Sequence, residues 1–402
     1  MPALDGLRGV AIALVVSYHF VFLSGAADAE SAADRALWSV VGVGWAGVDL
    51  FFVLSGFLIT GILYDAKAPA GQYLRSFYGR RVLRIFPVYY MFLLLLMFAL
   101  PLVDSDGRDA AGAVRENFVW YATYIVNFQP IFHSGISTEF LFAGHLWSLA
   151  VEEQFYLVWP LVVLVCSRRT LMGVCLLAIV CALGIRVGFQ VADAGAGLSY
   201  ELMPARMDTL AVGALVALAW RSPRDLALLA RWMPRAVLVA AVSLAVLCGI
   251  RRDLAPPFDA WILTIGLSSF AILFGGMLLM VISAAPGGAI HALFSQRPLR
   301  ALGRYSYALY LIHLHVAVVL LHRLDIVGDM PAVVGSTIPG IVAFFAVASV
   351  ISLSLAWVSW HLWEKQFLKM KERFPYVRRG AAVEPASAAA IFGSPAAADS
   401  LS

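Results

Sequence analysis

Ten apolar segments, each close to the ~20 residues that cross a bilayer as a helix, occupy most of this sequence. Hydrophobic residues make up 61% of the chain and charged residues only 13%, a composition far from that of a soluble domain. We therefore predict an all-α fold class, a polytopic membrane bundle over residues 1–379, with a disordered cytoplasmic tail at 380–402. The expected spans are residues 4–24, 46–64, 84–103, 145–166, 170–190, 203–220, 234–250, 259–283, 303–322 and 334–361.

The basic residues outside these spans are divided unequally between the two sides. With the N-terminus inside, 20 of the 29 Lys and Arg residues fall in inside loops or the tail, and 6 fall in outside loops. Cytoplasmic loops carry such an excess, so we predict that both termini are cytoplasmic. The N-terminus lacks the basic stretch and cleavage site of a signal peptide, so the first span is expected to be retained.

The remaining composition argues against two kinds of ligand. Basic residues are spread over short loops, which does not suggest a nucleic acid partner; membrane lipids are the expected surroundings. None of the four cysteines has metal-ligand spacing, and no metal is expected.

The first span carries two costly side chains, Arg8 and His19, together with Asp5 and Ser17. Eleven residues separate Arg8 from His19, so both lie on one helix face, about 16 Å apart along the axis. A charge at the bilayer centre costs about 2.5–3.5 kcal/mol, so such groups normally face a polar interior. An imidazole can accept a proton from a hydroxyl, which makes His19 the leading catalytic candidate. The alternative is a polar residue that joins two helices.

The second span has Asp49 near its outer end, on one face with Val53, Gly56 and Thr60. Gly56 allows another helix to approach closely. The Asp49 carboxylate is expected either to orient an imidazole or to pair with an arginine. An N-cap carboxylate at the interface is an equally good interpretation of the composition.

Three arginines, Arg80, Arg81 and Arg84, stand at the inner side of the third span. Arg81 and Arg84 are three residues apart, so they point the same way if this segment is helical. Two guanidinium groups at the cytoplasmic mouth can clamp a phosphate or pyrophosphate. Charge alone favours the simpler interpretation, ordinary anchoring of the inside loop.

The fourth span begins with a polar stripe, in which His145, Ser148, Glu152 and Tyr156 follow helical spacing. Two adjacent carboxylates inside a span, Glu152 and Glu153, are hard to explain by packing alone. We expect at most one of them to face the stripe and the other to need its own partner.

Two later spans carry further polar residues. Arg206 and Asp208 are ~200° apart on a helix, so they are expected to pair with other helices rather than with each other. In the ninth span Ser306, Tyr310 and His313 share a face; for His313 we favour a hydrogen-bonding role in the core over contact with substrate.

Taken in order along the chain, these motifs resemble the membrane acyltransferase-3 family, the ten-span bacterial O-acyltransferases. The resemblance covers about residues 3–368 and includes the Arg-x10-His spacing of the first span. One departure is Gln366, which stands where the last family motif usually has proline; it changes the turn after the tenth span. The matching segments are residues 4–19, 47–60, 80–89, 147–156, 206–213, 302–313 and 364–367.

The resemblance implies transfer of an acyl group, usually acetyl from acetyl-CoA, to a hydroxyl of a sugar or related extracytoplasmic product. It implies that His19 is the essential histidine, with Arg8 as its paired basic residue. It also places Arg81 and Arg84 where acyl-CoA is expected, which makes anion clamping the better interpretation of that pair. The localisation implied is the bacterial cytoplasmic (inner) membrane.

We therefore expect acyl-CoA to enter from the cytoplasm with its phosphates on Arg81 and Arg84. His19, in the outer half of the bilayer, acts either as general base on the acceptor hydroxyl or as a nucleophile that carries the acyl group. A water-accessible tunnel must then join His19 to the arginine pair. The expected catalytic residues are His19, Arg8, Asp49 and Glu152; the cofactor-binding residues are Arg81, Arg84 and Arg80; the substrate or network residues are Asp5, Trp147, Ser148, Glu153, Tyr156, Arg206, Asp208, Tyr310 and His313.

Other functions remain open at this stage. A proton-coupled transporter or exporter suits buried charges and a polar cavity equally well, although the sequence has no internal repeat. A sensor or scaffold with a structural polar core is a second alternative. The acceptor is open among a cell-surface glycan, a lipid-linked sugar, another hydroxyl compound and a macrolide-type metabolite.

Overall fold

The computed structural model describes residues 1–25, 31–66, 69–103, 106–132, 143–251, 258–324, 327 and 336–376. Ten helical segments in this part of the chain are long and apolar enough to cross a membrane, which confirms the predicted bundle and its number of spans. The same residues contain no β-strand. The predicted disordered tail, 380–402, lies outside the described residues.

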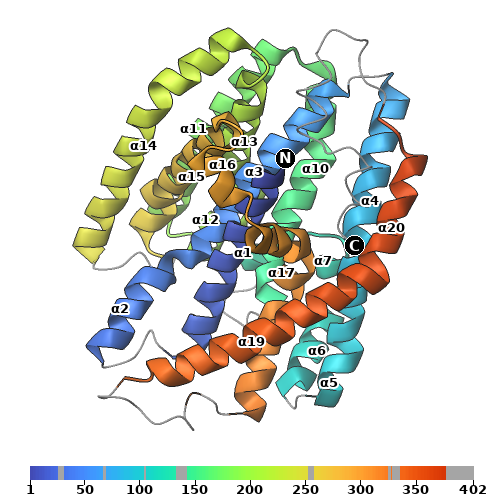
Figure 1. Ribbon diagram of the computed structural model, residues 1–402, viewed down its shortest axis with the longest axis vertical. Coiled ribbons are helices and arrows are strands. Elements are labelled where there is room, and N and C mark those ends of the chain that lie inside the picture. Colours follow the sequence, from blue (N-terminus) through green and yellow to red (C-terminus); the bar gives the residue numbers. More distant parts are fainter. Residues whose placement is uncertain are drawn as a thin grey trace.

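The helices of the bundle lie side by side, with α14 at one edge and α4 with α20 at the opposite edge (Figure 1). The long helices are α1 (Pro2–Leu23), α3 (Gly47–Asp65), α4 (Ala70–Leu94), α10 (Trp147–Val165), α11 (Arg168–Val191), α13 (Met203–Ala219), α14 (Pro223–Arg251), α15 (Leu267–Ser283), α17 (Arg297–Arg323) and α19 (Ile338–Ser359). The shorter elements are α2 (Ala32–Val41), η2 (Gly42–Ala46), η3 (Leu95–Ala99), α5 (Leu100–Val103), α6 (Asp106–Glu116), α7 (Phe118–Ala122), η4 (Val126–Phe128), α8 (Gln129–Phe132), η5 (Gly144–Leu146), α12 (Ala196–Glu201), η6 (Ile262–Gly266), α16 (Ala289–Phe294), η7 (Trp360–Glu364), α20 (Lys365–Lys369) and η8 (Met370–Arg373).

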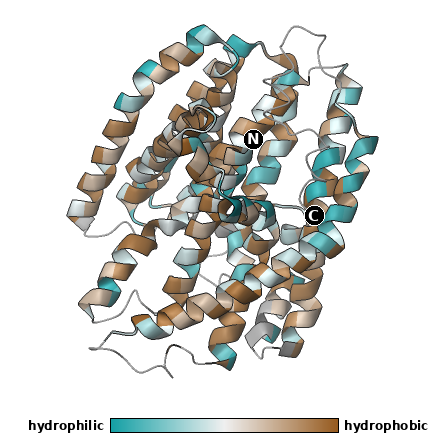
Figure 2. Cartoon of the chain, viewed as in Figure 1, coloured by the Kyte–Doolittle hydropathy of each residue, from teal (hydrophilic) through white to brown (hydrophobic). Residues whose placement is uncertain are grey.

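Two segment boundaries differ from the prediction in ways that matter for function. Helix α4 begins at Ala70, well before residue 84, so its arginines lie on a helix and not in a loop. The last span continues from α19 through α20 to Arg373, and Gln366 lies inside α20, where a proline would remove a helical hydrogen bond. Hydropathy alone underestimates the length of both helical segments because their ends are rich in basic residues. Figure 2 shows hydrophilic residues where α4 lies beside α20.

Glycines allow the central helices to approach closely. A Cβ added to Gly56 on α3 would lie 1.9 Å from the carbonyl oxygen of Leu210 on α13, so the predicted close approach at Gly56 is confirmed. A Cβ added to Gly303 on α17 would lie 1.8 Å from the carbonyl oxygen of Asp5 on α1. Small residues at such crossings permit the backbone packing that holds membrane helices together. They therefore set the positions of α1 and α3, which both border the site described below.

Replacement of Gly213 by alanine tests this packing. A Cβ at Gly213 on α13 would lie 2.0 Å from the Val53 carbonyl oxygen, so the helices must separate, and we expect a loss of about 1–3 kcal/mol of stability. The measurement is the midpoint of thermal denaturation in detergent. Gly184→Ala on α11, where nothing lies within 4 Å of an added Cβ, is the matched control and should not melt earlier. Equal midpoints for the two variants would contradict the close crossing.

Candidate active site

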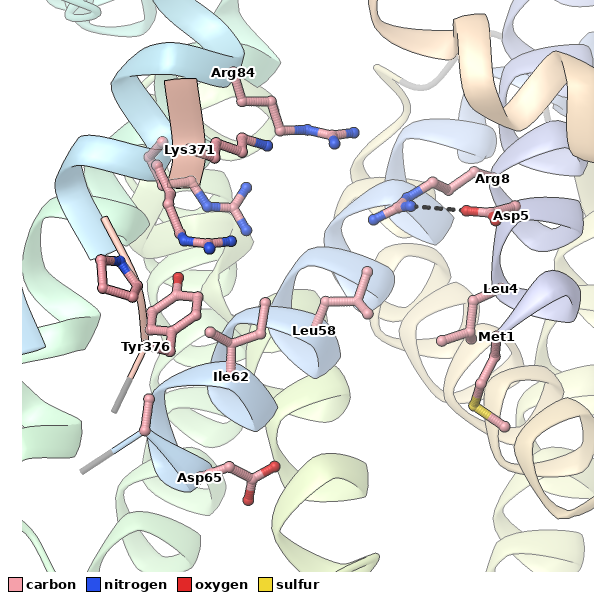
Figure 3. Close-up of a pocket in the computed structure, with 14 residues that line it drawn as sticks. Met1, Leu4, Asp5, Arg8, Leu58, Ile62, Asp65, Arg84, Lys371 and Tyr376 are labelled. Atoms are coloured by element: carbon pink, nitrogen blue, oxygen red, sulfur yellow. Dashed lines mark hydrogen bonds and ion pairs between the residues drawn. The ribbon is translucent and has the colours of Figure 1, made fainter. Parts of the chain in front are cut away.

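A cavity of about 640 Å³, called here the basic cavity, opens at the end of the bundle that carries the N-terminus. Helices α1, α3 and α4 and the segment after α20 line it. Figure 3 shows Arg84 and Lys371 on one side and Arg8 on the other, all pointing into the space between them. The basic side chains that line the cavity are Arg8, Arg80, Arg81, Arg84 and Lys371.

The two carboxylates that line the basic cavity are already paired. Asp5 accepts a hydrogen bond from Arg8 at 3.2 Å, and Asp65 forms an ion pair with Arg221 at 2.5 Å. Arg221 itself does not line the cavity. The lining therefore has a large excess of positive charge, as an anion-binding site requires.

The arginines of α4 point the same way, as predicted from their helical spacing. Arg81 stacks over the ring of Tyr156, with 4.6 Å from its Cζ to the ring centroid. Arg80 donates from Nε to the Phe374 carbonyl oxygen at 2.6 Å, and its guanidinium lies 4.7 Å from the centre of the Tyr376 ring. Burial raises the pKa of the Tyr376 phenol above its ordinary value, so this ring is neutral at pH 7. Stacking holds both guanidinium planes in place while their outer N–H groups remain available.

A second cavity of about 100 Å³, called here the inner cavity, continues into the bundle. It shares Arg8, Arg81 and Arg84 with the basic cavity, so the two cavities adjoin at these three arginines. Its polar walls also come from α3, α10 and α17. The other polar lining residues are Ser55, Ser148, Glu152, Glu153, Tyr156, Ser306, Tyr307 and Tyr310.

Both carboxylates of α10 border the inner cavity, so the expectation that only one faces the polar stripe is wrong. Glu152 accepts a hydrogen bond from Ser55 Oγ at 2.5 Å, and Tyr156 Oη donates to Ser55 Oγ at 3.0 Å. Glu153 makes no side-chain hydrogen bond to any described residue. The inner cavity is bordered by α4, α10 and α17, so it is wide enough for two successive residues of α10 to line it.

Tyr310 and Ser148, which both line the inner cavity, contact each other. The Tyr310 hydroxyl donates to the His145 carbonyl oxygen at 2.9 Å and lies 2.6 Å from Ser148 Oγ. His19 lines neither of the two cavities. The lining of the inner cavity reaches Tyr310, whose carbonyl oxygen is linked to His19 through His313, and the open tunnel to His19 stays a prediction.

His19 is hydrogen-bonded to His313, with 3.1 Å between His19 Nδ1 and His313 Nε2. His313 is fully buried, in agreement with the predicted core role. Its Nδ1 donates to the carbonyl oxygens of Tyr310 at 2.8 Å and Leu309 at 3.1 Å, because a carbonyl can only accept. In a neutral ring, Nε2 of His313 must then be an acceptor, so the shared proton belongs to Nδ1 of His19.

The same network assigns the lone pair of His19. Its Nδ1–H also donates to the Val15 carbonyl oxygen at 3.0 Å, which agrees with a proton on that nitrogen. Nε2 of His19 therefore carries the free lone pair, and no described residue forms a hydrogen bond with it. A half-buried imidazole held in one tautomer with a free Nε2 has the form of a general base or a nucleophile.

Four of the candidate residues lie together elsewhere, in a buried cluster between α3, α10, α11 and α13. Asp49 accepts a hydrogen bond from Arg206 at 2.7 Å, so of its two expected partners the structure shows the arginine and not an imidazole. Asp208 pairs with Arg186 at 2.7 Å, which confirms that Arg206 and Asp208 pair with other helices. Trp147 stacks on Arg206 at 5.5 Å.

None of Asp49, Trp147, Arg206 and Asp208 lines either cavity. Paired charges buried in this way hold helices in register. The roles predicted for these four residues therefore stay predictions, at a place separate from the two cavities.

The residues of these sites that were not among the sequence candidates include Ser55, Lys371 and Tyr376. Ser55 is a polar residue inside an apolar span, a signal that the sequence does contain. Lys371 and Tyr376 lie in a basic stretch after the last span that has the composition of ordinary inside anchoring. Only the return of that stretch to α4 brings them to the basic cavity.

The family model Acyl_transf_3, described as an acyltransferase domain, matches residues 1–360. No solved structure matches the chain. The curated relatives described next are named as O-acetyltransferases, and the chain spans about half of their length.

Three relatives illustrate the similarity. The putative peptidoglycan O-acetyltransferase YrhL of Bacillus subtilis (strain 168) is 31% identical over 344 residues, 79% of this chain and 49% of the relative. The peptidoglycan O-acetyltransferase OatA of Listeria monocytogenes serovar 1/2a is 30% identical over 328 residues, 78% of this chain and 49% of the relative. The O-acetyltransferase OatA of Staphylococcus aureus (strain NCTC 8325) is 28% identical over 349 residues, 83% of this chain and 53% of the relative.

Proposed function

Since this chain belongs to the Acyl_transf_3 family of acyltransferases, we propose that it moves an acetyl group from acetyl-CoA to a hydroxyl of a cell-wall or exported glycan. Two relatives are named as peptidoglycan O-acetyltransferases, which supports a glycan acceptor. The excess of basic residues on the side of the N-terminus supports a cytoplasmic position for both termini, in the inner membrane of a bacterium. The basic cavity then opens to the cytoplasm, where acyl-CoA is present.

The observation that carries this proposal is the basic cavity with the inner cavity behind it. Coenzyme A bears about four negative charges on its phosphates, and five basic side chains line the basic cavity. A volume of about 640 Å³ is within the ordinary range for small-molecule sites. The inner cavity, reached past Arg8, Arg81 and Arg84, gives the direction in which the pantetheine arm would extend into the bundle. The thioester is thereby directed toward Tyr310 and the histidine pair.

In the proposed reaction, Nε2 of His19 removes the proton from the acceptor hydroxyl. The hydroxyl oxygen forms a C–O bond with the thioester carbonyl carbon, and the C–S bond of acetyl-CoA breaks. The proton on His19 then passes to the departing thiolate, so that CoA leaves as a thiol. In this scheme the donor approaches His19 past Tyr310 and Ser148, which line the inner cavity and contact each other.

The alternative step uses the same nitrogen. If Nε2 of His19 attacks the thioester first, the acetyl group becomes bound to the imidazole before the acceptor takes it. Rapid quenching of a reaction that contains labelled acetyl-CoA and no acceptor separates the two schemes. A labelled histidine peptide identifies the nucleophilic scheme. Its absence from a preparation that transfers acetyl once the acceptor is added identifies general base catalysis.

The proposed activity is tested with purified protein and acetyl-CoA labelled in the acetyl group. We expect release of free CoA and labelling of a soluble peptidoglycan fragment, both dependent on His19. Movement of intact acetyl-CoA into vesicles without cleavage of the thioester would instead identify a carrier.

His313 provides a prediction about positioning. His313→Ala removes the acceptor that holds the His19 tautomer, a hydrogen bond worth about 1–2 kcal/mol, so kcat should fall about 10-fold. His313→Gln, whose amide oxygen can accept from His19 Nδ1–H, should restore part of the loss, and KM for acetyl-CoA should change little in either variant. His291→Ala on α16 is the control. A loss of kcat that glutamine does not reduce would refute the positioning role.

A further inference from the structure

We propose that the segment from Met370 to Tyr376 completes the donor site and binds the 3′-phosphoadenosine end of coenzyme A. The segment follows α20 and lies beyond residues 1–360, the part of the chain that the family model matches. It supplies Lys371, Pro375 and Tyr376 to the lining of the basic cavity. The proposal rests on the proposed function, and it adds the recognition of the nucleotide to that function.

Contacts with α4 hold this segment at the cavity. Ser76 Oγ donates to the Pro375 carbonyl oxygen at 2.7 Å, and Arg80 Nε donates to the Phe374 carbonyl oxygen at 2.6 Å. The Phe374 ring packs over Gly79, where an added Cβ would lie 2.4 Å from the ring. Glycine at this position therefore lets the segment lie directly on α4. The backbone is fixed before any ligand binds, which lowers the entropic cost of binding.

Lys371 is placed among like charges. Four arginines line the basic cavity with it, and no carboxylate of the described residues forms an ion pair with its ammonium group. Asp5 and Asp65, the acidic residues of the lining, are paired with Arg8 and Arg221 instead. Repulsion among these cations is unfavourable in the free protein and is relieved by a bound polyanion.

The order of residues along the cavities indicates which part of the donor each one meets. Arg81 and Arg84 line both cavities, so they lie at the junction that the diphosphate and pantetheine must pass. The nucleoside then lies on the side of Arg80, Lys371 and Tyr376, which line only the basic cavity. Lys371 and Arg80 therefore bind the 3′-phosphate. The Tyr376 ring, fixed by the Arg80 guanidinium at 4.7 Å, offers a planar surface on which adenine stacks.

The test compares binding of CoA and 3′-dephospho-CoA to the purified protein by titration calorimetry. Wild-type protein should bind CoA at least about 10-fold more tightly than 3′-dephospho-CoA, because the charge-assisted hydrogen bonds from Lys371 and Arg80 are lost with the 3′-phosphate. Lys371→Gln should lower the affinity for CoA about 10-fold and leave the affinity for 3′-dephospho-CoA unchanged. The unchanged affinity also shows that the variant is folded. Lys369→Gln, an exposed lysine two residues earlier, is the control and should bind both ligands as wild type does.

Tyr376 is tested with the same two ligands. Tyr376→Ala should weaken CoA and 3′-dephospho-CoA by the same factor, about 5-fold, and Tyr376→Phe should restore both, because the ring and not the hydroxyl meets adenine. The phosphate assignment would be overturned if Lys371→Gln lowered the affinity for both ligands equally, or if the wild type did not prefer CoA. Either result would leave the proposed acetyl transfer standing. Lys371-dependent binding of CoA without any acetyl transfer would overturn the proposed function and support the nucleotide site.

Discussion

Replacement of His19 by alanine is expected to lower kcat for acetyl transfer by about 10²–10⁴-fold, the range for loss of a general base. The reason is geometric: the hydrogen bonds of His19 use its Nδ1 and leave the lone pair of its Nε2 free. His19 is half-buried and lines neither cavity, so affinity for CoA and the thermal denaturation midpoint should change little. The measurement is CoA release with titration calorimetry on the same preparation.

A matched control for this variant is His361→Ala. His361 lies on η7 and its Nδ1 donates only within its own helix, to the Trp357 carbonyl oxygen at 2.9 Å. It should transfer acetyl at the wild-type rate. Turnover of His19→Ala at the same rate as this control would remove His19 from the mechanism.

The second large effect is expected from the double variant Arg81→Ala/Arg84→Ala. Both guanidinium groups line both cavities, and each charge-assisted hydrogen bond to a phosphate contributes about 1.5–3 kcal/mol. Loss of both guanidinium groups should lower the affinity for CoA by about 10²–10⁴-fold, while the transfer rate at saturating acetyl-CoA should change far less. The result is read from KM for acetyl-CoA and from the affinity for CoA.

The control for the arginine pair removes equal charge from another helix. Arg231 and Arg235 are exposed on α14, away from both cavities, and Arg231→Ala/Arg235→Ala should bind CoA normally. If both double variants lower the affinity for CoA equally, the effect comes from the net charge of the protein and not from a binding site. An unchanged affinity in Arg81→Ala/Arg84→Ala would exclude these arginines from donor binding.

The sequence predicts the number of spans well because hydropathy is a local property. It places the start of α4 too late because residues 70–83 are polar and basic, yet they continue the helix when they pack against α20. The correct start matters, since it turns Arg80, Arg81 and Arg84 into residues of one helix face that borders a cavity.

The partners of the polar residues could be predicted only as alternatives. Whether Asp49 meets an arginine or an imidazole depends on which helix lies beside α3, and Gly56 shows that a helix approaches without showing that it is α13. Lys371 could not be found at all, because it joins Arg80 only through the folding of the last segment onto α4. The contact between Tyr310 and Ser148 likewise depends on two helices far apart in the chain.

Vesicles reconstituted with the protein provide the most direct measurement of transfer across the membrane. Acetyl-CoA, which does not cross the bilayer, is added outside, and a soluble peptidoglycan fragment is enclosed inside. Only molecules whose basic cavity faces outward can then use the donor, so a mixed orientation does not obscure the result. We predict acetylated fragment inside and an equal amount of free CoA outside, both abolished by His19→Ala. Acetylation that requires donor and acceptor on the same side of the membrane would contradict transfer from the basic cavity through the bundle to His19.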